Sequence, residues 1–271
     1  MASALFQGTA HAVLYSKFRP FPPAALINNI INYVKLKTNA PLKKAVDIGC
    51  GSGQSTVVLA KHFENVVGLD VSEAQIECAK AINFSSNIEY KVANGERLPF
   101  SPCSVNLVTL CQAVHWFETD ILFKEVERVL IPNGVISAYG YWIPLPVLGK
   151  EEEDKKISEL IKQYLHEEKL GQYWDKERYI VQNHYSDIHL PFKDVHRTSL
   201  VKETECSLAD YIGYLSTWSA YQKLYRKDKK EASNLLSYIQ NELSEIIGKD
   251  KSPKDIIFKL HTDYFMIMGH R

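Results

Sequence analysis

The sequence lacks an excess of charge of either sign. Lys and Arg together number 32, as do Asp and Glu, so the formal net charge at pH 7 is zero. Partners with phosphate backbones attract basic proteins, so this balance argues against a nucleic-acid partner. No apolar run approaches the roughly 20 residues of a membrane span, and residues 1–12 lack the charged start and long apolar stretch of a secretory signal. We therefore expect a cytoplasmic protein without membrane contact.

Paired cysteines are also missing. The chain has five cysteines, an odd number, widely spread and without a C-x-x-C pair, so reduced thiols are expected in place of disulfides or a zinc site. His184 and His189 lie five positions apart with Asp187 between them, but no further well-spaced ligand accompanies them. We expect no metal.

Alternating strand and helix patterns fill the first half of the chain. With 271 residues, 45% of them hydrophobic, the chain is long enough for one large α/β domain with an elaboration. The unbroken alternation predicts a parallel sheet with right-handed crossovers. The predicted strands span 43–48, 65–69, 87–92, 104–111 and 135–141, and the predicted helices span 55–63, 72–82 and 119–130.

A glycine-rich turn joins the first strand to its helix. Gly49, Gly51 and Gly53 follow Asp47, but the G-x-G-x-x-G pattern fails at Gln54 and no Gly-Lys-Ser/Thr follows. Glycines let the backbone approach a ligand, and the helix start offers unpaired N–H groups. A ligand with nucleotide-like parts is expected here, with a plain tight turn as the alternative.

Polar residues follow three further strands, at the sheet edge where open α/β sheets bind ligands. Asp70 lies 21 residues beyond Gly49 and is placed either to accept hydrogen bonds from ribose hydroxyls or to cap the next helix. Asn94 offers a carbonyl acceptor, although Asn-Gly also makes ordinary turns. His115 is either catalytic or structural, and Trp116 either belongs to the site or to the core.

These motifs resemble a known family. Asp47-x-Gly49-x-Gly51-x-Gly53 resembles the first motif of the class I S-adenosylmethionine-dependent methyltransferases of the type 11 kind. Two segments, Tyr-x-x-x-Arg-Pro at 15–20 and Gln-Ala-x-His-Trp-Phe at 112–117, are similar to the trans-aconitate methyltransferase-like branch. The resemblance covers roughly residues 10–145 and, more loosely, the rest. Asn94 and Asn133 depart from the family pattern.

The resemblance implies a fold, a cofactor and a site. The fold is a doubly wound, mostly parallel seven-stranded sheet, with a last strand over 256–268 antiparallel beside the fifth. The cofactor is S-adenosyl-L-methionine. The residues implied for it are Tyr15, Asp47, Gly49, Gly51, Gly53, Asp70, Val71, Asn94, Gly95 and Gln112. The implied catalytic residues are Arg19, His115 and Trp116, and the implied substrate residues are Trp142, Trp218 and Tyr221.

We expect a single domain over 1–271. Within it we place an N-terminal lid segment at 1–40, a cofactor-binding core at 41–142, an insertion or cap at 143–194, and C-terminal strands and helices at 195–271 that complete the sheet and the lid. Helices are predicted over 150–170, 208–224 and 233–247, with a lysine-rich solvated stretch at 225–231.

The expected function is methyl transfer to a small molecule by a monomer or homodimer. A carboxylic acid is the leading acceptor, because a carboxylate is ionised at pH 7 and Arg19 could position it through a bidentate pair. N-methylation of a small amine or heterocycle, with His115 as the base, is the first alternative. A non-catalytic cofactor-binding scaffold is the second, left open by Asn94 and Asn133.

Overall fold

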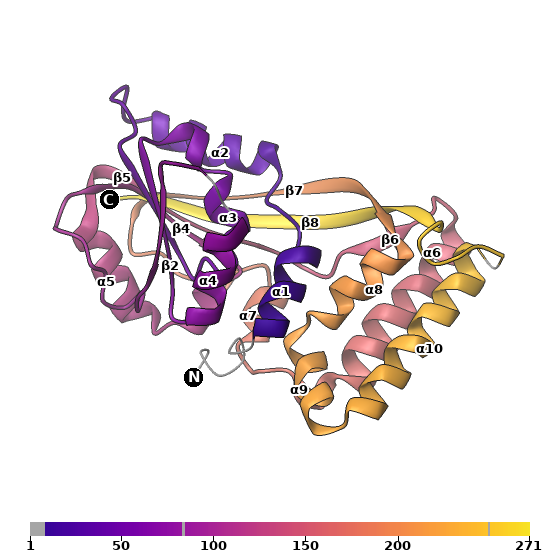
Figure 1. Ribbon diagram of the computed structural model, residues 1–271. Helices are drawn as coiled ribbons and strands as arrows, with labels where there is room; N and C mark the ends of the chain where they lie inside the picture. The colour runs from indigo at the N-terminus through magenta and orange to yellow at the C-terminus, as the bar shows by residue number, and fades with distance from the viewer. Residues whose placement is uncertain (1–8, 83–84, 249) are drawn as a thin grey trace.

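A computed structural model of the chain describes residues 9–82, 85–248 and 250–271. Its central element is one mixed β-sheet (Figure 1). Five strands pair in parallel in the order β3-β2-β1-β4-β5, and β8 then pairs antiparallel with β5. The predicted doubly wound sheet and its antiparallel last strand are confirmed. The strands are β1 Lys44–Ile48, β2 Asn65–Asp70, β3 Ile88–Val92, β4 Val105–Cys111, β5 Leu130–Tyr141, β6 Leu145–Val147, β7 Lys193–Ser207 and β8 Ile257–His270.

The far edge of the sheet is a long antiparallel ribbon. β7 pairs with β8 along its whole length, so seven strands follow the order β3-β2-β1-β4-β5-β8-β7. The three-residue β6 pairs with residues 259–261 of β8, on the side that β5 occupies farther along. The ribbon therefore begins on the parallel sheet and extends well beyond it, as Figure 1 shows.

Successive residues of the central strands face opposite layers of the core. Ala45 packs with α2 residues such as Ile27, whereas its neighbour Val46 packs with α5 residues such as Val126. This two-residue period explains why the parallel strands are apolar almost throughout. The elements around the sheet are α1 Thr9–Phe18, α2 Ala24–Lys35, α3 Gln54–Val57, η2 Ala60–His62, α4 Glu73–Ile82, η3 Val114–Trp116, α5 Thr119–Val129 and α7 Arg178–Gln182.

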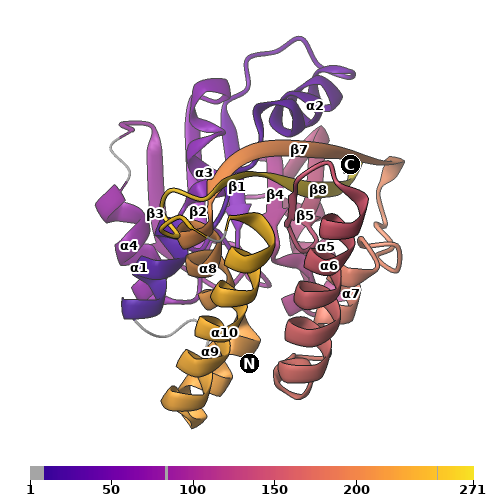
Figure 2. The ribbon, with the colours of Figure 1, turned by 90° about the vertical axis from the view of Figure 1, so that its right-hand side faces the viewer.

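A second group of helices lies beyond the sheet, where the ribbon ends (Figures 1 and 2). We call these helices the cap. They come from both sides of β7 in sequence, and their apolar residues merge with the core under α2 into one cluster. The cap is therefore assembled from two chain segments, one before and one after β7. Its members are α6 Glu151–Ser158, the π-helix η4 Glu159–Lys169, η5 Gly171–Tyr173, α8 Leu208–Ser216, α9 Ser219–Lys227 and α10 Lys229–Ile247.

Three predicted helices differ from the observed ones. The helix predicted over 55–63 is a four-residue α3 followed by the 3₁₀ turn η2. The helix predicted over 208–224 breaks at Thr217, whose Oγ1 donates to the carbonyl of Tyr214 at 2.6 Å. The lysine-rich stretch at 225–231 ends α9 and begins α10, and between them Asp228 caps α10 by accepting a hydrogen bond from the N–H of Glu231 at 2.8 Å.

The N-terminal helix α1 lies between the sheet and the cap (Figure 1). It packs against α4 on one side and α8 on the other. In the part of the chain that the structure describes, no helix combines the length and apolar character needed to cross a membrane.

Candidate active site

The glycine turn after β1 adopts the backbone conformation that favours glycine. Gly49, Gly51 and Gly53 have φ angles of 69°, 54° and 90°. A Cβ on Gly51 would point toward a cleft, 3.8 Å from Oε1 of Gln75 and 3.9 Å from the Tyr15 ring. The backbone at Gly51 is therefore open to a ligand, as expected for a turn that binds one.

Two of the predicted residues support this turn from beneath instead of lining the cleft. A Cβ on Gly53 would lie 2.4 Å from the Tyr90 hydroxyl, so glycine there allows close packing. Asp47 is completely buried and accepts hydrogen bonds from Oγ1 of Thr56 at 2.7 Å and Oγ1 of Thr109 at 2.8 Å. Burial raises the pKa of Asp47, although these hydroxyls oppose the effect. Asp47 thus joins β1, β4 and α3.

The cleft above the turn has a volume of about 300 Å³. It lies at the carboxyl ends of β1, β2, β3 and β4, where doubly wound sheets bind ligands. Eight of the ten residues implied for the cofactor line it, together with Trp116 and with others that the sequence did not identify. The full lining is Tyr15, Gly49, Gly51, Asp70, Val71, Ser72, Gln75, Ala93, Asn94, Gly95, Glu96, Cys111, Gln112, Ala113, Trp116 and Phe117.

Asp70 lines the cleft and also caps the next helix. Its Oδ2 accepts a hydrogen bond from the N–H of Gly51 at 2.9 Å, and its Oδ1 accepts one from the N–H of Ser72 at 2.8 Å. Burial raises the pKa of Asp70, while these backbone donors lower it. Each carboxylate oxygen keeps a lone pair, so the group can still accept from two ligand hydroxyls.

Asn94 and Gly95 line the cleft just after β3, the strand that pairs with the end of β2 at Asp70. The Asn94 side chain accepts a hydrogen bond from the N–H of Glu96 at 2.9 Å, so it forms the local turn and also faces the cleft. Gln75 has a buried Oε1 without a hydrogen-bond partner among the described residues. A carboxylate, an exposed amide and an unpartnered buried amide around an open glycine turn fit the adenosyl ligand expected from the sequence.

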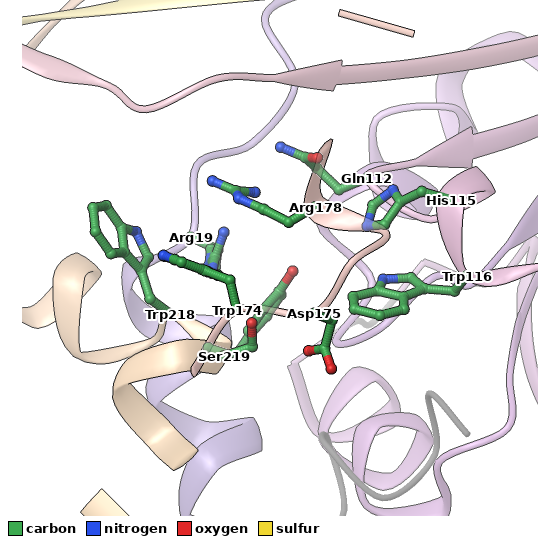
Figure 3. A pocket seen from close by; sticks show the side chains of 10 residues that line it. Arg19, Gln112, His115, Trp116, Trp174, Asp175, Arg178, Trp218 and Ser219 are labelled. Carbon is green, nitrogen blue, oxygen red and sulfur yellow. The ribbon is translucent and has the colours of Figure 1, made fainter. Parts of the chain in front are cut away.

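A smaller pocket of about 50 Å³ adjoins this cleft, at the junction between sheet and cap (Figure 3). Tyr15, Gln112 and Trp116 line both cavities, so the two adjoin at these side chains. We call the smaller one the acceptor pocket. Its lining is Tyr15, Arg19, Gln112, His115, Trp116, Trp174, Asp175, Arg178, Trp218 and Ser219.

Gln112 is held in place by its backbone and its amide. It has a φ of 53°, which is unusual outside glycine, and its Nε2 donates to the carbonyl of Tyr141 at 2.6 Å. This conformation turns the chain sharply after β4 and directs Gln112, His115 and Trp116 to the two cavities.

Arg19 lines the acceptor pocket but is engaged by the surrounding protein. Its Nε donates to Oγ1 of Thr217 at 2.8 Å, its Nη1 to the hydroxyl of Tyr141 at 3.0 Å, and its Nη2 to the carbonyl of Thr217 at 3.2 Å. Its Cζ also lies 4.7 Å from the ring centroid of Tyr15. Arg19 therefore joins α1 to β5 and to the cap.

His115 is buried, and its Nδ1 has no hydrogen-bond partner among the described residues. Burial, with a smaller effect of the Arg178 charge, lowers the pKa of His115 to about 3. The imidazole is therefore neutral at pH 7 and a weak base.

Of the three predicted substrate residues, the pocket includes one. Trp218 lines it and is buried. Trp142 lies behind the pocket, with its ring centroid 4.6 Å from Cζ of Arg178. Tyr221 is buried in the cap beside Tyr225 and lines neither cavity.

Four lining residues were not identified from the sequence: Trp174, Asp175, Arg178 and Ser219. Three of them, Trp174, Asp175 and Arg178, belong to the segment at 143–194 predicted as an insertion or cap. The aromatic content was a usable signal, because Arg178 lies between two tryptophan rings, but no spacing pattern identifies Arg178 itself. Across residues 9–82, 85–248 and 250–271, no group of three or more His, Cys, Asp or Glu side chains could hold a metal ion.

Comparisons with known proteins agree with the geometry. Residues 46–138 match the model of a methyltransferase domain family. The chain is 32% identical over 218 residues to a Dictyostelium discoideum protein named as a methyltransferase, covering 80% of this chain and 78% of that protein. It is 26% identical to CRG1 of Saccharomyces cerevisiae, named as an S-adenosylmethionine-dependent methyltransferase, covering 93% of each. A solved structure described as a type II methyltransferase of Anaeromyxobacter dehalogenans has a TM-score of 0.74 and 29% identity, covering 93% of this chain and 98% of that one.

Proposed function

Because this chain belongs to the class I S-adenosylmethionine-dependent methyltransferases, we propose that it methylates a carboxylate oxygen of a small organic acid. The chain is an enzyme, and its cofactor is S-adenosylmethionine. The residues of the larger cleft are those that would hold this cofactor, with Asp70 at the ribose and the backbone of Gly49 and Gly51 close to the ligand.

The charge of the acceptor pocket is the observation that carries the proposal. Two guanidinium groups, those of Arg19 and Arg178, line it, and neither forms an ion pair with a carboxylate among the described residues. The carboxylate that does line the pocket, Asp175, is paired with Lys223 at 2.7 Å. Buried cations are normally compensated, so a pocket with this imbalance favours an anionic acceptor. The similarity of the segments at 15–20 and 112–117 to the trans-aconitate methyltransferase-like branch supports the same substrate class.

For this reaction the protein mainly has to place the acceptor in line with the methyl group. The bound cofactor supplies a methyl group on a positively charged sulfur, and transfer forms a C–O bond as the C–S bond breaks. A carboxylate is ionised at neutral pH and needs no base. Tyr15, Gln112 and Trp116 lie where the two cavities meet, so they are placed to align the acceptor with the methyl group and to exclude water.

The weak basicity of His115 disfavours the amine alternative. An ammonium acceptor must lose a proton before it attacks, and a group with a pKa of about 3 is a poor general base at neutral pH. The scaffold alternative is not retained, because the chain is an enzyme.

A labelled-cofactor assay tests the proposal. The protein is incubated with radiolabelled S-adenosylmethionine and each of propanoate, hexanoate, succinate and benzoate, and separately with the matched amines of the monoacids. We expect label transfer to at least one acid, with product that releases methanol on alkaline hydrolysis, as methyl esters do. Transfer to the amines alone, into an alkali-stable product, would replace O-methylation by N-methylation.

A further inference from the structure

The guanidinium of Arg178 has no hydrogen-bond or ion-pair partner among the described residues. Its Cζ lies 4.6 Å from the ring centroid of Trp142 and 4.8 Å from that of Trp174, so the guanidinium is held between two indoles. Its Nε is buried without a hydrogen-bond partner, and no ion pair joins Arg178 to any other described residue. Arg178 is half-buried, and a charged group with a buried, unused donor is costly unless a ligand or water satisfies it.

The neighbouring carboxylate does not compensate Arg178. Asp175 lies three positions earlier in the chain and lines the same pocket, but its Oδ1 accepts a hydrogen bond from Nζ of Lys223 at 2.7 Å. Figure 3 shows the Asp175 carboxylate directed away from the Arg178 guanidinium. Arg178 therefore keeps its charge available to the pocket.

Another unused donor lines the same cavity. Nε1 of Trp218 is buried without a partner among the described residues, and an indole N–H can only donate. Within the described chain the same pocket also holds one unpartnered acceptor, Oδ2 of Asp175, but its two unused donors, one of them charged, suit a ligand that brings acceptor oxygens.

Arg19 contrasts with Arg178 in this respect. Three nitrogen atoms of the Arg19 guanidinium already donate to Thr217 and Tyr141, so contacts within the protein fix the orientation of this planar group. The sequence had suggested Arg19 as the group that binds the acceptor.

We propose that Arg178, held between Trp142 and Trp174, binds the carboxylate of the methyl acceptor, and that Arg19 instead ties α1 to the cap. This inference rests on the proposed O-methylation of an acid. The planar fork of Arg178 donates two parallel hydrogen bonds to the carboxylate, and each oxygen keeps a lone pair to attack the methyl carbon. The two indoles fix the plane of the fork and so the orientation of the acid.

Two substitutions at Arg178 test this assignment against a matched control. Arg178→Met removes the charge, Arg178→Lys keeps the charge without the fork, and Lys176→Met removes an exposed cation two positions away. KM and kcat are measured with the best acid among propanoate, hexanoate, succinate and benzoate, and cofactor affinity is measured by calorimetry.

The expected result is a selective loss of acid binding. Arg178→Met should raise KM for the acid by about 10- to 100-fold, Arg178→Lys by less, and Lys176→Met should leave it unchanged. Cofactor affinity should be unchanged in all three, because Arg178 does not line the larger cleft. A KM within about twofold of wild type in both Arg178 variants, with the wild type methylating acids, would overturn the assignment and leave the proposed function intact.

A binding measurement covers the case in which no acid is methylated, which would count against the proposed function itself. Thermal unfolding is then followed with S-adenosylhomocysteine and each of the four anions. Stabilisation of the wild type and Lys176→Met, but not of Arg178→Met, supports Arg178 as the anion-binding group. Equal responses of the wild type and Arg178→Met, including no response in either, overturn it.

Discussion

Nε of Arg19 donates a hydrogen bond to Oγ1 of Thr217 at 2.8 Å, across 198 positions of the sequence. Through this contact the end of α1 is joined to the junction between α8 and α9. The same guanidinium reaches Tyr141 at the end of β5, so one side chain connects the N-terminal helix, the sheet and the cap. Because Tyr15 of α1 lines both cavities, this connection also sets the position of a residue of the site.

Breaking this connection at Thr217 should loosen α1. Thr217→Val removes the acceptor of the Arg19 Nε–H at nearly constant volume, which should lower the free energy of unfolding by about 1–3 kcal/mol and weaken cofactor binding. Ser216→Ala is the control, since Oγ of Ser216 donates to the carbonyl of Gly213 at 2.6 Å in the same helix without touching Arg19. Urea unfolding and calorimetry measure both effects. Equal losses in the two variants would show that the Arg19 contact is unimportant.

Substituting Gly51 should separate backbone strain from ligand exclusion. Gly51→Ala places a Cβ toward the cleft at a φ of 54°, whereas Gly149→Ala places one in open space at a φ of 74°. Both should lose about 1–2 kcal/mol of stability from the left-handed backbone. Gly51→Ala alone should also lose cofactor affinity. If calorimetry finds equal cofactor affinities in the two variants, the backbone at Gly51 does not approach the cofactor.

Asp70 should contribute strongly to cofactor affinity. Asp70→Asn keeps the shape of the side chain but replaces one acceptor oxygen with a donor NH₂ group. The variant can therefore no longer accept hydrogen bonds from Gly51, Ser72 and both ribose hydroxyls at the same time. We expect the dissociation constant for S-adenosylmethionine to rise about 10- to 100-fold. Asp255→Asn, at an exposed position, serves as the control. An unchanged dissociation constant in Asp70→Asn would place the ribose elsewhere.

His115 should make stability depend on pH in the acidic range. Burial and then Arg178 lower its pKa to about 3, from an ordinary value of 6.5. Between these values the unfolded chain binds the additional proton, so stability is full above about pH 6.5 and falls as the pH drops toward 3. His115→Gln should reduce the slope of unfolding free energy against pH by up to about 1.4 kcal/mol per pH unit near pH 5.

Urea unfolding at a series of pH values measures this slope, with exposed His189→Gln as the control. In a plot of the rate of acid methylation against pH, we expect no rise or fall near neutral pH that depends on His115. A change of rate near neutral pH that is present in the wild type and lost in His115→Gln would support His115 as a general base.

The fold and the larger cleft could be predicted from sequence because their signals are local. A strand, a glycine turn and a helix occur within about 20 residues, and Asp70 follows at the end of the next strand. The acceptor pocket could not be predicted in the same way, because its walls come from α1, η3, the segment before α7 and the α8–α9 junction. Arg178 and Arg19 look alike in sequence. Only their tertiary contacts distinguish Arg19, whose guanidinium already donates hydrogen bonds within the protein, from Arg178, whose guanidinium donors are unused by the described residues.

The break in the helix at Thr217 likewise depends on a tertiary contact that the sequence pattern does not reveal. Residues 208–224 have one continuous helical pattern, but Thr217 and Trp218 interrupt it where Arg19 arrives from the N-terminal segment. Likewise, Asp47 and Gly53 match a cofactor motif by spacing, yet their contacts are with Thr109 and Tyr90 inside the protein.

The β7–β8 ribbon has a mechanical consequence for access to the site. Its strands run from the parallel sheet to the cap, so along that edge a ladder of backbone hydrogen bonds connects the two parts. Opening of the junction then depends on the side away from the ribbon, where α1 lies between α4 and α8. We therefore expect any opening between the sheet and the cap to require displacement of α1 from α4 or from α8.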